Sequence, residues 1–433
     1  MALLAVACGN AGSDKAEETP TTPGGTGTVT TGKIDLNKNV PVDAPGVSDT
    51  EIKVAAVTTN SNNPTGSYAP LVDGVKAYFE MINEGGGIYG RKLVVGNARD
   101  DQLGSNRQTV QASLSQDDAF ATFIATVFFT GAQLLAEANQ PVFMWNINKE
   151  FNGHPTFFAN NPALCFTCAG HIQPYLAKQL GATKVGIIGY AVDQSKDCAA
   201  GIKASFAKYP TAKVVYSDIS LSFAQQLGPQ VSKMKQDGVD LVLTCIDLQE
   251  SFTLAKEMNK QGMKAIQQLP QGYDPAFIAK NGDLLEGSIL SPQFLAFEHQ
   301  PQIQEIKDLF KWADKINVKV SELTAVGWQV AAQLYTGLAG AGPEFSQQKV
   351  VNYLNTLTNY SDNGFLDPID WTKGHIDPIT HPEARGDQEC ANFLKVENGK
   401  FVPLYAEPGK PWVCFKLSDP NVDNPVNKSF APS

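Results

Sequence analysis

The sequence predicts an α/β fold with two lobes, each organised around a parallel sheet. The chain has 433 residues, and a domain usually spans ~100–200 residues, so two lobes are expected. Between residues 51 and 262, apolar strand-like runs alternate regularly with helix-like segments. Most of these runs are continuously apolar, which is typical of parallel strands that helices cover on both faces.

The first series of alternating elements indicates one lobe. In its first helix, Leu71, Val75, Tyr78 and Ile82 are spaced four, three and four residues apart, so they share one helix face. We predict strands at 51–59, 92–101, 119–127 and 141–147, and helices at 67–83, 105–116 and 130–140.

A second series of the same kind indicates the other lobe. We predict strands at 182–191, 212–219 and 239–247, and helices at 198–209, 227–238 and 251–262. Repetition of the βα pattern after a break is what two α/β lobes in one chain produce.

The C-terminal third changes character and is mainly helical before it ends in strands. Helix 302–315 is expected to bury Ile303, Ile306, Phe310 and Ala313. Helix 321–342 is apolar nearly all round and is expected to be buried, and Ser346 is expected to cap helix 346–357. The Asn-Gly pair within 393–405 predicts a β-hairpin.

Charge argues against nucleic acid as a partner, and hydropathy argues against a transmembrane helix. The formal net charge is −10 and the sequence pI is near 5.1, whereas binding to nucleic acid needs a basic surface. No apolar run reaches ~18 residues, so no transmembrane helix is predicted.

The N-terminal stretch predicts a membrane anchor followed by a tether. MALLAVACGN resembles the end of a bacterial lipoprotein signal, so residues 1–8 are interpreted as a signal remnant and Cys8 as a lipidated cysteine. A free thiol in a disordered tail is the alternative. Residues 9–47 are rich in Gly, Thr and Pro, so we expect a flexible tether. These features place the protein outside the cytoplasm, lipid-anchored to the outer face of the cell membrane.

Seven cysteines leave one unpaired if the others form disulfides, and Cys8 is the odd one. Cys390 and Cys414 flank the predicted hairpin and are expected to bond each other. The other four are Cys165, Cys168, Cys198 and Cys245, for which three connectivities remain open. The CxxC pair at 165–168 is typical of a redox site or half a zinc site, but no second CxxC follows. Three structural disulfides require an oxidising compartment.

Motifs for catalysis, phosphate binding and metal binding are missing. The sequence has no GxSxG, Walker A or strand-linked GxGxxG pattern. The cluster HIDPITH (375–381) fits no standard metal spacing and is interpreted as a solvated loop. We therefore predict no catalytic residue, no metal and no cofactor.

The order and spacing of several short patterns resemble one protein family. These patterns are EIKVAAVTTNS…TGSYAPLVDGVKAYFEMINEGGGIYGRKLVVGNARDD, ATVFFTGAQLLAEANQPVFMW, KVGIIGYAVDQSKDCAAGIKASF, QVSKMKQDGVDLVLTCIDLQESFTLAKEMNKQGMK and PIDWTKGH…FLKVENGKFVP. Together they resemble type I periplasmic solute-binding proteins of the leucine/isoleucine/valine-binding family, which serve ABC importers. The resemblance covers roughly residues 48–417.

This resemblance implies two Rossmann-like lobes joined by three crossing strands. The crossings are expected near 158–163, 288–294 and 365–369. Lobe 1 then comprises 48–160 plus 295–364, lobe 2 comprises 161–290 plus 366–417, and 418–433 forms a tail. Ligands of open α/β sheets bind beyond the carboxyl ends of strands, so the ligand is expected between the lobes.

The resemblance also implies ligand-binding residues in lobe 1. Tyr68 matches the aromatic residue that covers the ligand. Thr130 is expected to cap the helix after the third strand, with Phe129 and Gly131 offering backbone N–H groups to a ligand carboxylate. A purely structural helix cap at Thr130 is the alternative. Beyond the next strand the family's small residue and threonine are replaced, and Trp145 and Asn148 are expected to contact ligand instead.

Lobe 2 departs further from the family pattern. Gln194 occupies a position where the family often has tyrosine, and we assign it no role. Gln271 stands where amino-acid binders carry a carboxylate for the ligand ammonium, so Asp247 or Asp274 takes that role or the ligand lacks an ammonium. Tyr273 is a further candidate contact. Core packing is the alternative for both Tyr273 and Trp145.

We therefore predict a monomeric binding protein of an ABC importer that closes its lobes on an amino acid, branched-chain or otherwise neutral, or a related small polar metabolite. Its partners are expected to be the permease and ATPase subunits. One alternative is an exported α/β enzyme that uses Asp247 with Asp274, or the HIDPITH segment. Another is a binding protein for an amide, a urea or a small aromatic acid.

Overall fold

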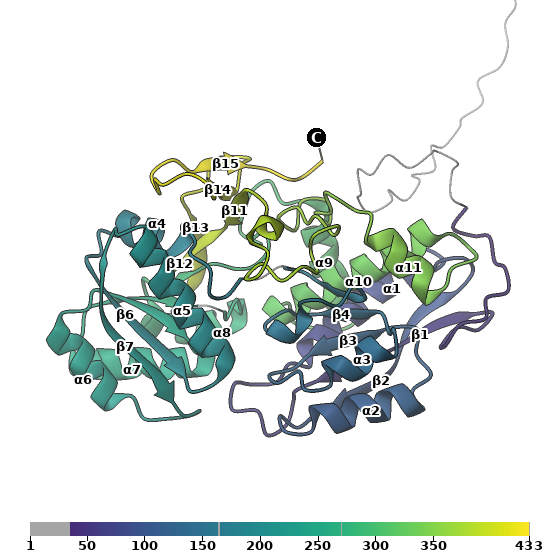
Figure 1. Cartoon of the computed structure of the whole chain (residues 1–433), viewed down its shortest axis with the longest axis horizontal. Helices are drawn as coiled ribbons and strands as arrows, with labels where there is room; N and C mark the ends of the chain where they lie inside the picture. Colours follow the sequence, from purple (N-terminus) through teal and green to yellow (C-terminus); the bar gives the residue numbers. More distant parts are fainter. Residues whose placement is uncertain (1–34, 163–164, 270, 433) are drawn as a thin grey trace, which may run out of the picture.

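The computed structural model describes residues 35–162, 165–269 and 271–432, in which two α/β lobes lie side by side (Figure 1). Cys8 and residues 9–34 of the predicted tether lie outside these ranges. In the described part of the chain, no helix is long and apolar enough to cross a membrane.

Lobe 1 contains a five-stranded parallel sheet in the order β2-β1-β3-β4-β5. Its strands are β1 (Glu51–Thr58), β2 (Lys92–Asp100), β3 (Thr122–Ala125), β4 (Val142–Met144) and β5 (Phe157–Ala159). The helices of this lobe are α1 (Pro70–Glu84), α2 (Asn106–Gln116), α3 (Ala132–Glu137), α9 (Gln304–Lys315), α10 (Glu322–Ala341) and α11 (Gln347–Leu354). Of these, α1, α2 and α10 pack on the sheet, and a 3-10 turn, η1 (Lys149–Phe151), follows β4.

Lobe 2 contains a seven-stranded sheet in the order β13-β12-β10-β9-β8-β6-β7. Five strands are parallel: β6 (Lys184–Tyr190), β7 (Lys213–Leu221), β8 (Leu241–Cys245), β9 (Ile266–Leu269) and β10 (Ile289–Leu290). The predicted Asn-Gly hairpin, β12 (Phe393–Glu397) and β13 (Lys400–Leu404), adds to this sheet in antiparallel orientation. The helices of this lobe are α4 (Ile172–Gln179), α5 (Asp193–Lys208), α6 (Gly228–Asp237), α7 (Leu248–Gln261) and α8 (Pro275–Leu285).

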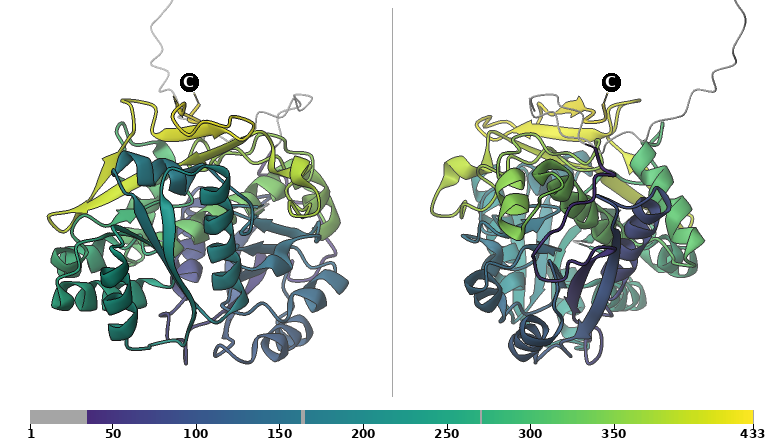
Figure 2. Two further views of the ribbon diagram at one scale, coloured as in Figure 1. Left: turned by 60° about the vertical axis from the view of Figure 1, so that its left-hand side comes forward. Right: turned by 90° about the vertical axis from the view of Figure 1, so that its right-hand side faces the viewer.

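A third, three-stranded sheet lies along one side of both lobes, at the top of both views in Figure 2. It consists of β11 (Gln388–Ala391), β14 (Trp412–Lys416) and β15 (Val426–Lys428), and the 3-10 turn η2 (Pro382–Arg385) precedes it. The Cys390–Cys414 disulfide joins β11 to β14, as the sequence predicted. The tail beyond 417 is thus partly a sheet strand, because β15 pairs with β14.

Residues 35–47 correct the tether prediction, because this stretch is held on lobe 1. The Arg91 guanidinium donates hydrogen bonds to Ser48 O at 2.6 Å and Val40 O at 2.8 Å. Leu36 and Val42 pack against the core of lobe 1. The composition of the stretch concealed these few apolar residues, which are enough to anchor it once Arg91 supplies donors.

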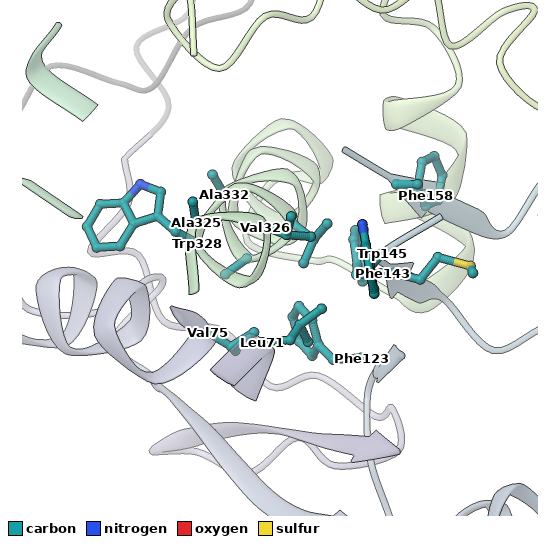
Figure 3. Close-up of a cluster of buried hydrophobic side chains, with 14 of the residues drawn as sticks. Leu71, Val75, Phe123, Phe143, Trp145, Phe158, Ala325, Val326, Trp328 and Ala332 are labelled. Atoms are coloured by element: carbon teal, nitrogen blue, oxygen red, sulfur yellow. The ribbon is translucent and has the colours of Figure 1, made fainter. Parts of the chain in front are cut away.

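Helix α10 is the buried centre of lobe 1, as its apolar sequence predicted. Figure 3 shows its Val326 and Trp328 among side chains of α1 and of the sheet. Two glycines allow α1 and α10 to touch at the backbone: a Cβ on Gly74 would lie 2.0 Å from Thr324 O, and one on Gly327 would lie 1.9 Å from Leu71 O. Any larger residue at either position would push the two helices apart.

Helix α9 corrects one predicted core residue. Phe310 is 41% exposed, and its ring meets that of Phe297 edge to face at 5.1 Å between centroids. Leu309 and Trp312 are buried in its place, beside Ile306 and Ala313. The buried stripe is rotated by about one residue from the predicted one, because α1 packs on the adjacent helix face.

Candidate functional site

The loops after β3 and β4 of lobe 1 meet the start of α5 of lobe 2, at the carboxyl ends of parallel strands in both sheets. Gln194 Nε2 donates to Val127 O at 3.1 Å and to Asn148 Oδ1 at 2.8 Å. Lys149 forms a 3.3 Å ion pair with Asp193. Strand ends of this kind are where open α/β sheets bind ligands.

A pocket of about 290 Å³ lies between these loops. Its apolar lining includes Phe128, Phe129, Ile147, Phe166 and Val192. Its polar lining consists of Thr130, Lys149, Glu150, Asp193, Gln194 and Asp197. The volume is close to the lower end of ligand sites, ~300 Å³, and the combination of apolar walls with a few polar groups is typical of them.

Two aromatic side chains expected to contact the ligand lie together in the core of lobe 1, outside the pocket lining. The rings of Tyr68 and Trp145 meet edge to face at 5.3 Å between centroids. Both are nearly fully buried, at 6% and 3% exposed. Burial raises the pKa of Tyr68 to about 12, and the negative charges of Asp247 and Glu322 add to the rise. The Tyr68 hydroxyl is therefore exposed to the charge of one carboxylate from each lobe.

The predicted anion site at the start of α3 is wrong in two respects. The helix begins at Ala132 with Gly131 as its N-cap residue, and no side chain caps it. Thr130 is exposed and lines the pocket instead. The Gly131 N–H donates to Asn106 Oδ1 at 2.8 Å, so it is not free for a ligand carboxylate. Residue spacing could not reveal this, because Asn106 reaches Gly131 from another helix.

Asp247 begins helix α7 and connects it to β6. Its Oδ1 accepts hydrogen bonds from Gln249 N at 2.8 Å and Glu250 N at 3.1 Å, and its Oδ2 accepts one from the Tyr190 hydroxyl. Glu250 lies beside it, 5% exposed. Burial raises the pKa of Glu250 to about 7, and the charge of Asp247 adds to the rise. Two carboxyl groups are therefore buried close together at the start of α7.

We expect this carboxyl group to make stability fall as the pH rises. A folded-state pKa raised from 4.5 to about 7 stabilises the fold fully below pH ~4.5, and this stabilisation is lost as the pH rises through about 7. Glu250→Gln should therefore raise the unfolding free energy by about 1 kcal/mol at pH 8 and change it little at pH 4.5. Urea unfolding at both pH values measures this. The exposed Glu51→Gln serves as control, and equal pH slopes for the wild type and Glu250→Gln would contradict the assignment.

The loop after β9 docks on lobe 1 rather than facing the pocket. The carboxylate of Glu322, at the start of α10, accepts from Gly272 N at 2.7 Å and Tyr273 N at 3.1 Å. Tyr273 is fully buried, stacks on Phe297 and donates its hydroxyl to Glu298. This geometry corresponds to the core-packing alternative for Tyr273. Gln271 in the same loop is half-buried.

Several residues at this interface were not singled out from the sequence. Gln194 was set aside because it departs from the family pattern, yet it joins the two lobes. Tyr190 ends a buried strand, a position that could have marked it as facing the ligand edge. Glu322 gave no local signal, because its partners are about fifty residues away in the chain.

Asp274, a candidate partner of the ligand ammonium, instead caps α8: its carboxylate accepts a hydrogen bond from Phe277 N at 2.9 Å.

Comparison with known proteins agrees with this geometry. The periplasmic binding protein family matches residues 51–399. No curated protein matches the sequence significantly. A fatty acid ABC transporter substrate-binding protein from Thermomonospora curvata has a TM-score of 0.67 at 16% identity, covering 83% of this chain and 93% of that one.

Two further solved structures differ in the ligand they contain. An ABC transporter solute-binding protein from R. palustris in complex with 4-hydroxybenzoate has a TM-score of 0.65 at 17% identity, covering 84% of this chain and 97% of that one. A branched chain amino acid ABC transporter protein from Thermus thermophilus with bound valine has a TM-score of 0.65 at 15% identity, covering 83% and 96%. At these identities the likeness establishes the fold and not the ligand. The match over 51–399 shows that the chain belongs to the periplasmic binding protein family, a family of extracytoplasmic binding proteins and not of enzymes.

Proposed function

We propose that this protein is the solute-binding component of an ABC importer, and that it closes its two lobes over an amino acid or a related small polar metabolite with an ammonium group. The lobes contact each other through the loops after β3 and β4 and the start of α5, and hinge closure over a ligand uses such contacts. The permease and ATPase subunits are the expected partners, and the binding protein itself is expected to be a monomer.

The ligand class is inferred from two buried aromatic rings and from the carboxylate charges that act on one of them. Tyr68 and Trp145 meet edge to face, and the charges of Asp247 and Glu322 act on Tyr68 from the two lobes. An ammonium group is stabilised by aromatic faces and by carboxylates that have little water around them. Asp247 thus provides the negative charge that pairs with the ligand ammonium. Gln271 cannot do this, because a neutral amide does not balance a buried cation.

A small aromatic acid is the second candidate ligand. The pocket wall is formed by Phe128, Phe129 and Phe166, and the Lys149 ammonium lies at its rim. Aromatic rings and a single cation suit a benzoate-like molecule, and the R. palustris relative holds 4-hydroxybenzoate. Against this ligand, Lys149 is already paired with Asp193.

For the location, we propose that Cys8 is acylated and that the protein is held on the outer face of the cell membrane. The remaining six cysteines form three disulfides, which persist in oxidising compartments. The residues between Cys8 and the described body provide the spacer that such an anchor needs.

Native mass spectrometry of the protein isolated from its own cells tests both proposals. We expect an N-terminus at Cys8 with added acyl mass, and a bound small solute that is released on denaturation.

A thermal-shift screen of the purified protein should then show a higher melting temperature with amino acids or amines, because a ligand at 100 times its Kd adds ~2.7 kcal/mol of stability. Shifts with aromatic acids alone would favour the second candidate. A product retaining residues 1–7 without lipid would exclude the anchor, and no shift with any solute would exclude the binding function.

A further inference from the structure

A second and larger cavity lies where the chain passes between the lobes. Its volume is about 610 Å³, within the ~300–1,000 Å³ range of small-molecule sites. Its walls include Asn160 after β5, Gln293 after β10, and residues 367–370 before the third sheet. These are the three segments through which the chain connects lobe 1 to lobe 2. We call it the hinge cavity.

The remaining walls of the hinge cavity come from α5 and from the segment that leads into the third sheet. Ile202 and Ser205 on α5 line one side, and the Ser205 hydroxyl accepts a hydrogen bond from Gly170 N at 2.9 Å. Arg385 and Glu389, which precede and begin the third sheet, line another side. Phe166 lines both this cavity and the interlobe pocket. The two spaces are therefore neighbours with different walls.

The hinge cavity is lined by a carboxylate, Asp367, that forms no ion pair with the described residues. Within the described ranges, no ammonium or guanidinium nitrogen lies within 4.0 Å of the Asp367 carboxylate. Burial raises the pKa of Asp367 to about 7, and the more distant Lys428 only partly opposes this. The two lining cations are both engaged, Lys373 with Asp370 at 3.7 Å and Arg385 with Glu389 at 3.4 Å. The net charge of the lining is therefore negative.

Neutral acceptors accompany Asp367. Asn160 is 2% exposed and donates to Gln293 Oε1 at 3.4 Å, and its own Oδ1 accepts no hydrogen bond among the described residues. Metal ions are a poor match, since the described chain contains no group of three side chains suited to hold one. A carboxylate and an amide oxygen without a hydrogen-bond partner, lining the same cavity, instead suit N–H donors on a cation.

We propose that the hinge cavity is a second ligand site, which binds a small organic cation such as a primary diamine or a guanidinium compound through Asp367. The site is separate from the interlobe pocket and does not depend on which solute that pocket takes. Because all three connecting segments form its walls, an occupant contacts the part of the chain that must bend when the lobes move. Its binding is thereby coupled to the lobe arrangement, and the coupling is reciprocal.

Isothermal titration with 1,4-diaminobutane and with guanidinium tests the proposal. The uncharged 1,4-butanediol is the ligand control. The variant Asp367→Asn keeps the shape and removes the charge, and Asp283→Asn on the exposed face of α8 is the matched control. We expect wild type and Asp283→Asn to bind at least one cation with equal affinity, Asp367→Asn to bind it ~10-fold or more weakly, and none of the three to bind the diol.

Three results would overturn the proposal. The first is no binding of either cation to the wild type, and the second is equal binding by wild type and Asp367→Asn. The third is loss of cation binding in Asp247→Asn, which would place the probe between the lobes instead. Melting temperatures control for misfolding. Removal of a half-buried carboxylate that forms no ion pair should leave Asp367→Asn at least as stable as the wild type.

Discussion

Replacement of Asp247 by asparagine is expected to lower affinity for an ammonium-bearing ligand ~10–100-fold, because a hydrogen bond to a charged group contributes ~1.5–3 kcal/mol. The fold should survive the change. Asparagine is as good an N-cap residue as aspartate, so its side-chain oxygen can still accept from Gln249 N and Glu250 N at the start of α7. Titration calorimetry with the solute identified by mass spectrometry measures the loss.

Asp274→Asn provides the matched control for this experiment. Asp274 is also an N-cap aspartate of lobe 2, and it accepts from Phe277 N at 2.9 Å. The charges that raise the pKa of Tyr68 are those of Asp247 and Glu322, not that of Asp274. Asp274→Asn should therefore bind the ligand like the wild type. A loss confined to Asp274→Asn would assign the ammonium to the other aspartate, and no loss in either variant would indicate a ligand without an ammonium.

Removal of the Cys198–Cys245 disulfide is expected to have the largest effect on stability. This bond joins α5 to the end of β8 across a sequence separation of 47 residues, and closing a loop of that length lowers the unfolded state's entropy by the equivalent of about 4 kcal/mol. The double variant Cys198→Ser/Cys245→Ser should lose stability of that order in urea unfolding. Because α5 also carries Gln194 and Asp193, the double variant should also bind its ligand more weakly.

The Cys165–Cys168 pair is the natural comparison, since its sequence separation is only 3 residues. The same loop-closure relation gives roughly 1.5–2 kcal/mol for it. Cys165→Ser/Cys168→Ser should therefore be clearly more stable than the α5–β8 double variant. Equal losses in the two double variants would mean that local packing, rather than loop closure, determines the contribution of these bonds.

Much of the fold could be predicted from the sequence because helix and strand periodicity is local. The buried α10, the Asn-Gly hairpin and the cap at Ser346, which accepts from Lys349 N at 3.2 Å, all appear as predicted. The ends of the helices were predicted less accurately. Helix α5 begins at Asp193, five residues before the predicted start, because the polar stretch DQSKD shows no apolar periodicity.

The site was predicted less completely than the fold. The family resemblance implied Tyr68 and Trp145 as site residues, and their rings do lie together. Their contact with a ligand remains a prediction, as it does for Phe129, Asn148 and Asp247. The anion site at Gly131 failed because its N–H already has a partner, Asn106 Oδ1.

The sequence by itself determined the fold class, the alternation of elements within each lobe and the pairing of Cys390 with Cys414. These depend on side-chain period and on neighbours along the chain. Only the tertiary structure decided which polar groups remain free for a ligand. Glu322 engages the loop at Gly272, Gln194 joins the lobes, and Asp367 forms no ion pair with the described residues, although Lys428 acts on it from a distance. Hydrogen-bond satisfaction depends on partners that are distant in sequence, and a local pattern does not encode them.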